Sequence, residues 1–378
     1  NNLALNYAQL TNNGTLLGNS QLTVNASQVN QSASGKLFSG GDLFVGATGM
    51  NALGQVVALG NLTLQLADAF TAKTALAAGR NLNISSNGAI DNQSVMQGQA
   101  VNLRAGGQLT NNGQITTGNG SSTLSGSTIV LNGNGSLQGG GDVTLLSRDA
   151  IAVNGFTGTR GSLTLSAPGN IVNTALLYAA NNLALYANTI TNQRGDMLAG
   201  NNLSMQRDAA GNANSEVVNT SGNIETQSGD ITIRTGHLLN QRDGLSVNSW
   251  TEPATQTGVG KDKLYLSIKD FPVESLTIKK WEAHEYHNCT CQIDVTTYNS
   301  QFVPDVKDEI QKVASSITHS AVSANGGAGG VVSGRDISIF ASVMDNQASN
   351  ILSTRNIVLY GTELNNLSYQ NGTATEYY

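Results

Sequence analysis

The chain has 378 residues and a formal net charge of −6, and only 5% of its residues are aromatic and 12% charged. The negative charge argues against a nucleic-acid-binding protein, which should present a basic face. The 43 glycines and the shortage of aromatic side chains are unusual for a globular protein of this length, so one elongated repetitive body is expected instead. No apolar run has the length of a membrane-spanning helix.

The sequence repeats itself, because two apolar residues separated by one residue return at intervals of roughly 20 residues. These anchor pairs are Leu3/Leu5, Leu22/Val24, Leu43/Val45, Leu62/Leu64, Leu82/Ile84, Val101/Leu103, Val143/Leu145, Leu163/Leu165, Leu183/Leu185, Leu203/Met205 and Ile231/Ile233. The pattern then stops, and it resumes at Ile337/Ile339 and Ile357/Leu359. Disordered chains lack such evenly spaced anchors, so we interpret the repeats as a solenoid that is interrupted once.

Each repeat has the pattern of short strands joined by polar turns. In the unit around Asn182, the alternation of Leu183-Ala184-Leu185 places both leucines on one face of a strand. Three such strands can close into a coil, and stacked coils can pair strand on strand in parallel. We therefore predict an all-β parallel β-helix over residues 1–245 and 334–378. Loops or short extra strands are expected at the imperfect repeats 49–57, 118–131 and 207–223.

Asparagine recurs at a fixed place in the repeats, nine residues after the first anchor of its coil. The residues concerned are Asn12, Asn192, Asn240, Asn346 and Asn366. Asparagine is a common turn residue in any case, but recurrence at a fixed offset favours a specific role. We expect these side chains to hydrogen-bond one another along the axis, as asparagines do in cross-β ladders.

Units such as Asn2-Leu3-Ala4-Leu5-Asn6-Tyr7-Ala8-Gln9-Leu10-Thr11-Asn12-Asn13-Gly14 and Gly200-Asn201-Asn202-Leu203-Ser204-Met205 resemble the filamentous haemagglutinin repeats of bacterial two-partner-secreted exoproteins. The resemblance implies a right-handed β-helix that a dedicated partner pore exports across the outer membrane of a Gram-negative cell, and hence a secreted or cell-surface protein. Since the chain begins in mid-repeat, we expect a fragment of a longer protein.

Within that family, a repeat rod with a non-repeat module is similar to the contact-dependent growth inhibition effectors. In those proteins the central module binds an outer-membrane receptor on the target cell, and the toxin lies in a separate C-terminal domain. The resemblance therefore implies that the interruption is a candidate receptor-binding module.

The interruption, residues 246–333, differs from the repeats in composition. It contains both tryptophans, both cysteines and every lysine except Lys36 and Lys73. Its alternating stretches predict strands of an ordinary sheet, and they lie at 264–268, 275–278 and 292–298.

A helix is predicted towards the end of this segment. Val306, Ile310, Val313 and Ile317 recur at helical spacing, and Asp305 can cap the first turn. We therefore expect a small α+β insert, with the glycine-rich run 325–330 as a flexible linker back to the coils.

Recognition is expected in the insert, because the coils expose nearly interchangeable Asn, Ser, Thr and Gly side chains, whereas the insert concentrates aromatic and charged residues. The candidate receptor-binding residues are Trp250, Tyr265, Lys269, Lys279, Lys280, Trp281, Tyr286, Tyr298 and Phe302. The lysines could meet an acidic receptor loop or anionic lipopolysaccharide, or form a solvated face. For Trp281, a place in the insert's own core is an equal alternative.

The tightest cluster of metal-capable residues is His284, His287, Cys289 and Cys291. Zinc accepts two His and two Cys ligands, but this spacing fits none of the common zinc patterns. Because exported proteins tend to be oxidised, a disulfide between Cys289 and Cys291 is one possibility. Free buried thiols and a metal site stay open beside it. We expect no stoichiometric zinc and no other cofactor.

Parallel β-helices also include enzymes that cleave polysaccharides, and these need clustered carboxylates. Acidic residues are sparse along the repeats, whose one histidine is His237, so we expect no enzymatic activity. The leading hypothesis is a receptor-binding tip that acts as a monomeric filament. Its expected partners are an outer-membrane protein or lipopolysaccharide of target bacteria and the secretion pore of the producing cell. The alternatives are a haemagglutinin-type adhesin for host glycan or matrix, and a polysaccharide-cleaving enzyme.

Overall fold

The computed structural model describes residues 1–253, 276–285, 295–304 and 314–377. These residues divide into two units. Unit 1 comprises Asn1–Ser246 with Ser323–Tyr369, and unit 2 comprises Val247–Val322 with Gln370–Tyr378. Within the described residues, no helix is long and apolar enough to cross a membrane.

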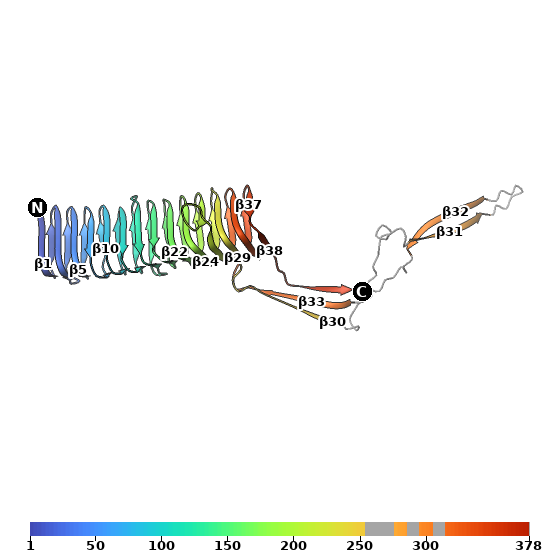
Figure 1. Ribbon diagram of the computed structural model, residues 1–378, viewed down its shortest axis with the longest axis horizontal. Helices are drawn as coiled ribbons and strands as arrows, with labels where there is room; N and C mark the ends of the chain where they lie inside the picture. Colours follow the sequence, from blue (N-terminus) through green and yellow to red (C-terminus); the bar gives the residue numbers. More distant parts are fainter. Residues whose placement is uncertain (254–275, 286–294, 305–313, 378) are drawn as a thin grey trace. The chain divides into compact units, whose positions relative to one another are not determined.

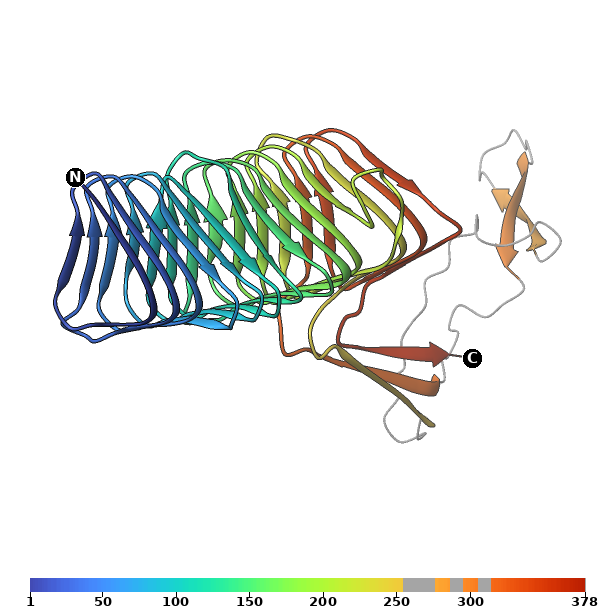
Figure 2. The same ribbon diagram turned by 60° about the vertical axis from the view of Figure 1, so that its left-hand side comes forward.

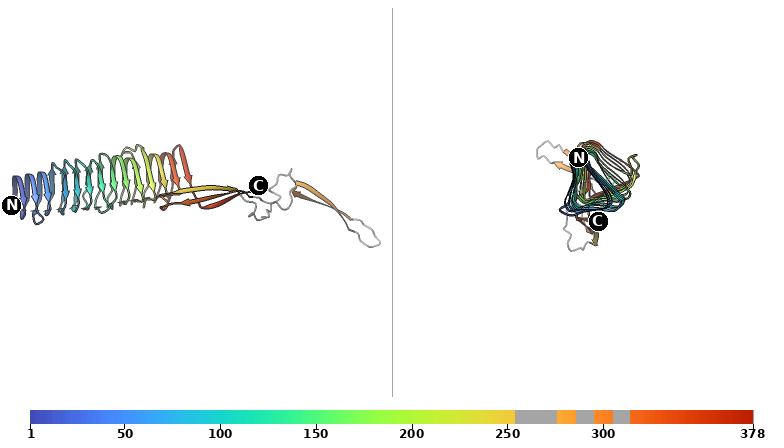
Figure 3. Two further views of the ribbon diagram at one scale, coloured as in Figure 1. Left: turned by 90° about the horizontal axis from the view of Figure 1, so that it is seen from below. Right: turned by 90° about the vertical axis from the view of Figure 1, so that its left-hand side faces the viewer.

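Unit 1 is an all-β parallel β-solenoid whose coils stack in sequence order from the N-terminus (Figure 1). Seen along the axis, the coils superpose (Figure 3). The larger sheet, sheet A, contains 21 strands. They are β1 Asn2–Asn12, β3 Gln21–Gln31, β5 Asp42–Ala52, β7 Leu62–Leu66, β8 Phe70–Ala72, β10 Asn81–Ser86, β11 Ile90–Asn92, β13 Ala100–Ala105, β14 Leu109–Asn111, β16 Ser122–Gly126, β17 Ile129–Leu131, β19 Val143–Ser147, β20 Ile151–Val153, β22 Leu163–Asn173, β24 Leu183–Gln193, β26 Leu203–Gln206, β27 Asn214–Thr220, β29 Ile231–Gln241, β35 Ile337–Gln347, β37 Ile357–Tyr360 and β38 Glu363–Leu367.

The second sheet of the solenoid, sheet B, contains 13 strands, one from each coil in order along the axis. They are β2 Thr15–Gly18, β4 Lys36–Ser39, β6 Gln55–Ala58, β9 Leu76–Ala78, β12 Val95–Gly98, β15 Gln114–Thr117, β18 Ser136–Gly139, β21 Thr157–Thr159, β23 Leu176–Ala179, β25 Asp196–Ala199, β28 Asn223–Thr226, β34 Gly330–Ser333 and β36 Asn350–Ser353. All pairings in both sheets of the solenoid are parallel, as the sequence predicts.

The anchors stack on one another in register and form the core of unit 1. Leu183 pairs with Leu163 of the preceding coil and with Leu203 of the following coil. All three are at most 1% exposed. Burial of apolar surface contributes roughly 25 cal/mol per Å², and here each coil obtains that burial only from its neighbours. The predicted inward register is therefore confirmed.

Two of the three imperfect repeats form regular coils, so the expectation of loops or short extra strands there is wrong. Residues 49–57 contribute to β5 and β6, and residues 118–131 to β16 and β17. In β16, Ser122 takes the place of the first anchor, is 1% exposed, and accepts a hydrogen bond from the amide of Val101 at 3.0 Å. This bond satisfies the buried hydroxyl, so the coil tolerates a polar anchor. The third imperfect repeat does contain a loop, between β26 and β27.

The asparagine ladder is confirmed over five consecutive bonds. The Nδ2 group of each asparagine donates to the Oδ1 of the next, at 2.8–2.9 Å, through Asn173, Asn192, Asn219, Asn240, Asn346 and Asn366. Asn12 does not join such a ladder, because Gln31 follows it in register, and its amide donates to the carbonyl of Lys36 instead. The ladder therefore needs asparagine in consecutive coils.

The solenoid continues across the interruption without a break. β29 pairs with β35 from Ile231 opposite Ile337 to Gln241 opposite Gln347. Figure 1 shows these two strands side by side although they lie far apart in the sequence. β28 pairs with β34 in the same way. The chain thus leaves and re-enters the solenoid within a single coil.

Unit 2 contains a three-stranded sheet and a two-stranded sheet (Figure 2). The first has the order β30–β33–β39, with β30 at Ser246–Pro253, β33 at Ala314–Ser323 and β39 at Gly372–Tyr377. The second consists of β31 (Leu276–Glu285) and β32 (Val295–Pro304), which are antiparallel over their full length.

Several expectations for this part of the chain are corrected by unit 2. The strands expected at 275–278 and 292–298 overlap β31 and β32, whereas 264–268 lies outside the described residues. Most of the predicted helix also lies outside them, but Ile317 belongs to strand β33 and pairs with Thr375, so the helix does not extend that far. The last residues do not form a coil, because β39 pairs with β33.

Replacing Leu185 by Asp should destabilise the solenoid by several kcal/mol, because Leu185 is 0% exposed and the carboxylate would have no partner inside the apolar stack. Thermal unfolding followed by circular dichroism would measure the effect. The matched control is Ala184→Asp on the adjacent, partly exposed position, which should change the melting temperature little. Equal melting temperatures for both variants would contradict the register.

Candidate functional site

The coil that contains β29 opens at the corner that follows Asn240. In three other coils this corner is a tight turn with a positive φ two residues after the ladder asparagine: 55° at Arg194, 49° at Ser221 and 47° at Ala348. In the open coil the positive φ falls on Gly244, at 61°. The chain therefore departs where the solenoid already has its left-handed corner, and a glycine makes the altered turn possible.

Asp243 ties the two ends of the opening together. Its backbone carbonyl accepts hydrogen bonds from the amides of Asn325 (2.8 Å) and Gly326 (3.1 Å). Its amide donates to Ser221 Oγ at 2.8 Å, and the same hydroxyl donates to the carbonyl of Gly327 at 2.6 Å. We call Ser221, Asp243 and residues 325–327 the clasp.

Two arginines support the clasp. The carboxylate of Asp243 forms an ion pair with Arg194, and Nε and Nη2 of Arg242 each lie 3.2 Å from the carbonyl oxygen of Gly326. Because Arg194 is 55% exposed, its ion pair adds little stability by itself. The glycine-rich run is thus an ordered, hydrogen-bonded return to the coil, and the interpretation as a flexible linker is wrong.

Ser221→Ala should loosen the clasp locally, because it leaves the amide of Asp243 and the carbonyl of Gly327 without their shared partner. A loss of about 0.5–1.5 kcal/mol is expected for bonds at such a partly exposed place, which corresponds to roughly two- to tenfold faster amide exchange at Asp243. Hydrogen exchange measured by mass spectrometry tests this. Ser228→Ala, which removes a 2.7 Å bond to the carbonyl of Gly200, is the control and should leave Asp243 protected.

The three-stranded sheet of unit 2 presents one candidate residue, Trp250, to solvent. Its ring stacks on His319 of β33, with centroids 5.0 Å apart and planes at 14°. Its Nε1 donates to Glu252 Oε1 at 3.3 Å, and the other oxygen of Glu252 lies 3.7 Å from His319 Nε2. Trp250 remains 43% exposed, so the arrangement can offer an aromatic surface to a partner. Sequence reasoning missed His319, because only the pairing of β30 with β33 brings it to Trp250.

The register of β31 with β32 separates the five candidate residues of this pair of strands. Alternate residues of a strand share a face. Lys280, Tyr298 and Phe302 therefore belong to one face, and Lys279 and Trp281 belong to the other. The register therefore does not place the five on the same side of this pair of strands.

The remaining candidates lie outside the described residues. These are Tyr265, Lys269 and Tyr286, together with Cys289, Cys291 and His287 of the possible metal or disulfide cluster. Over the described ranges, no group of three or more His, Cys, Asp or Glu side chains is arranged to hold a metal ion.

One titratable cluster lies on the solenoid beside the opening, and sequence reasoning did not find it. His237 of β29 contacts Asp345 Oδ2 through Nε2 at 2.8 Å and Glu216 Oε1 through Nδ1 at 3.2 Å. Burial disfavours the charged imidazole, but the bonds to both carboxylates outweigh it, and the pKa of His237 is raised above its ordinary value. The pKa of Asp345 is lowered, by the bond from Asn365 and then by His237. His237 thus links the coils on either side of the insertion.

The raised pKa of His237 predicts a pH-dependent stability. A group whose pKa is raised by folding stabilises the protein fully below its unfolded pKa, about 6.5, and this contribution is lost as pH rises through the folded value. The melting temperature of the natural chain should therefore fall relative to His237→Gln between about pH 6 and pH 8. Parallel melting curves for the two proteins over this range would contradict the assignment.

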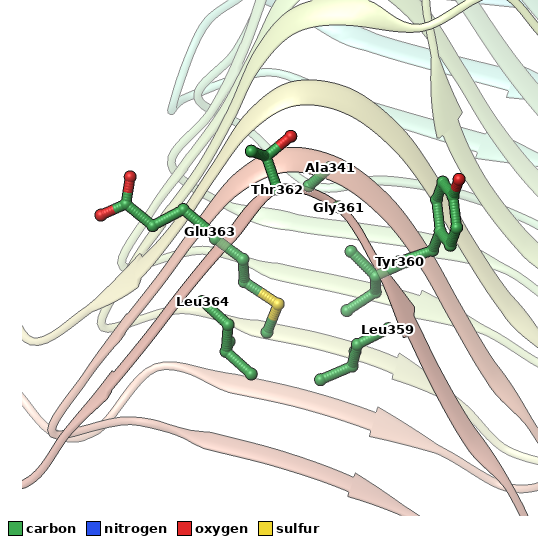
Figure 4. A pocket seen from close by; sticks show the side chains of 9 residues that line it. Ala341, Leu359, Tyr360, Gly361, Thr362, Glu363 and Leu364 are labelled. Carbon is green, nitrogen blue, oxygen red and sulfur yellow. The ribbon is translucent and has the colours of Figure 1, made fainter.

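The last coil opens its apolar interior to a pocket of about 150 Å³ (Figure 4). Leu359 and Leu364 point into the pocket and are 40% and 54% exposed, whereas Tyr360 and Glu363 point away from it. Among the described residues that line it, no pair of carboxylates faces the interior. The pocket is the open end of the core and does not have the arrangement of a glycan-cleaving site.

Comparison with protein families gives a match to the haemagglutinin repeat over residues 1–43, 38–113, 158–249 and 310–371. Among curated proteins, the chain is 45% identical to tRNA nuclease CdiA of Escherichia coli strain STEC_O31 over 91% of its length. It is 38% identical to deoxyribonuclease CdiA of Dickeya dadantii over 97%, and 43% identical to 16S rRNA endonuclease CdiA of Enterobacter cloacae over 84%.

The chain spans only a small part of these relatives, 10% of the E. coli and Enterobacter proteins and 11% of the Dickeya protein. No solved structure matches it.

Proposed function

This chain belongs to the haemagglutinin repeat family and is homologous to CdiA proteins, and from this premise we propose that it is the receptor-binding part of a contact-dependent growth inhibition exoprotein. In this proposal the solenoid is a right-handed, secreted, cell-surface spacer. Unit 2 docks to an outer-membrane protein or lipopolysaccharide of a target bacterium before toxin delivery. The secretion pore of the producing cell is the other partner.

The observation that carries the proposal is the contrast between the two units. Small polar side chains such as Asn, Ser and Thr recur on the outside of the solenoid, and β29 pairs with β35 across the opening in the same register as other neighbouring coils. Unit 2 has its own sheets and holds both tryptophans and most of the lysines. Aromatic side chains supply most of the binding energy in protein interfaces, and lysines steer encounter. Selective recognition is therefore assigned to unit 2.

Within unit 2 we assign contact to the exposed stack of Trp250 on His319 and to one face of the β31–β32 pair. The face with Lys280, Tyr298 and Phe302 carries two aromatic residues and one cation, whereas the opposite face carries Lys279 and Trp281. We propose that the first face contacts the receptor. For Trp281, on the opposite face, we keep the alternative that it belongs to the insert's own core. Tyr265, Lys269 and Tyr286 stay candidates.

The nuclease activities in the names of the relatives are not assigned to this chain. Those names describe proteins of which the chain spans about a tenth, and the toxin of this class lies in another domain by resemblance. The proposed role is docking without chemistry. Along the described part of the chain, no arrangement of carboxylates supports a polysaccharide-cleaving role.

Unit 2 is formed by two separate segments of the sequence, and the test removes or exchanges both of them. Replacing residues 247–322 by a short Gly/Ser linker and removing 370–378, while keeping the clasp, should leave a folded solenoid that no longer binds target bacteria. Cell binding is measured by flow cytometry, and folding by circular dichroism. Exchanging both segments for those of a relative with a different receptor should redirect binding. Exchanging residues 247–322 alone should redirect binding only weakly, because the chain's own β39 would then have to pair with the relative's β33.

Two outcomes would contradict the proposal. One is binding to target bacteria that survives removal of both segments with the solenoid intact. The other is undiminished binding to target cells that lack any single outer-membrane protein or the lipopolysaccharide core, accompanied by binding to eukaryotic cells, which would favour the adhesin alternative.

A further inference from the structure

The outer face of sheet B carries a row of residues, one from each strand, that alternates with the buried positions. From β4 to β25 each member pairs in register with the next. The row reads Phe38, Val57, Ala77, Gln97, Thr116, Gln138, Gly158, Tyr178 and Leu198. A Cβ on Gly158 would lie 2.7 Å from the ring of Phe156, so that ring occupies the space of the missing side chain. The row is apolar at both ends and polar in the middle.

The apolar ends of this row are accessible. Tyr178 is 36% exposed and Phe156 39% exposed, and Phe38, Val57 and Leu198 are partly exposed. Several other exposed large apolar residues of the solenoid lie in turns or in sheet A, such as Leu53, Leu59 and Leu146. Two apolar segments on one flat face, at a fixed separation, therefore mark a surface that water solvates poorly.

We infer that this face, from β4 to β25, pairs with a second copy of the chain in antiparallel orientation. The twofold axis lies between the two sheets and runs along the central strand β15. Because the nine strands are evenly spaced, this rotation places β4 on β25, β6 on β23, β9 on β21 and β12 on β18. The facing residues are Phe38 with Leu198, Val57 with Tyr178, Ala77 with the ring of Phe156, Gln97 with Gln138, and Thr116 with its own copy.

A second outward row supplies complementary charge. Lys36 is the first residue of β4, and Asp196 is the first residue of β25. The same rotation brings each Lys36 to the Asp196 of the other copy. Lys36 has no ion-pair partner among the described residues, and Asp196 uses Oδ1 for a 2.8 Å bond from Asn223. A dimer with parallel solenoid axes would reverse the strand direction across the interface, so Lys36 would face the far end of β4 and would not meet Asp196. The charges therefore favour the antiparallel arrangement.

The size of the face sets the strength of the contact. Nine strands spaced about 4.8 Å apart extend about 40 Å, and four residues of a strand cover about 13 Å, which gives about 1,000 Å² for the two copies together. The complementarity ends beyond these nine strands, because the next pair, β2 on β28, would place Leu17 opposite Glu225. This area is at the low end for specific complexes, so the dimer is weak and dissociates at low concentration. The inference replaces the monomeric filament expected from the sequence and is independent of the receptor-binding proposal.

Sedimentation velocity of the full 378-residue chain tests the inference over a concentration series from about 10 μM to about 1 mM, the range in which a weak dimer forms. The natural chain should pass from monomer to dimer. Lys36→Glu and Asp196→Lys should each lower dimerisation at least tenfold, because each places like charges opposite one another. An equimolar mixture of the two variants should restore dimers, because every facing pair is then of opposite charge.

Matched controls separate this face from general stickiness. Tyr178→Ser should weaken the dimer, whereas Tyr7→Ser, which removes an aromatic residue that is 62% exposed in sheet A, should not. Circular dichroism confirms that each variant is folded. A chain that stays monomeric throughout would overturn the inference. So would a dimer that both charge variants leave unchanged, or a mixture that fails to restore association.

Discussion

Stacking of each coil on the next in strict register is the interaction on which the whole structure depends. A coil is too small to bury its own apolar side chains, so Leu183 is covered only because Leu163 and Leu203 lie directly before and after it. The same register brings the buried asparagine amides within bonding distance. Since an unpaired buried amide would cost about 1–3 kcal/mol, the ladder penalises any slip of one coil against its neighbour.

Register also explains how one coil can be opened without loss of the solenoid. Asn240 donates to Asn346, and β29 pairs with β35 over its whole length, so the interruption removes no contact from the core. The entropy of closing a long loop grows only with the logarithm of its length, so a large excursion costs little more than a short one. The clasp offsets part of that cost, because the bonds from residues 325 and 326 to Asp243 hold the two ends of the loop together.

The sequence predicts what is periodic and local, as the anchors and the asparagine ladder show. The same reasoning failed at Ser122, where a hydrogen bond from Val101 replaces apolar burial, a substitution that a hydrophobic pattern does not register. It also failed for the glycine run, because glycines serve both mobile linkers and corners held by backbone bonds. At Ile317, an apolar spacing that suits a helix belongs to a strand, since its partner β39 comes from the far end of the chain. The stack of Trp250 on His319 could not be predicted for the same reason.

The split of unit 2 between two segments of the chain limits how its larger sheet can vary. β33 lies between β30 and β39, so the central strand of its larger sheet must match both a strand that follows the exit and a strand that follows the last coil. A change on β33 that suits one edge alters its pairing with the other. The β31–β32 pair has no such constraint among the described residues, because each of its strands pairs only with the other. Sequence variation is therefore less constrained on the β31–β32 pair than on the three-stranded sheet.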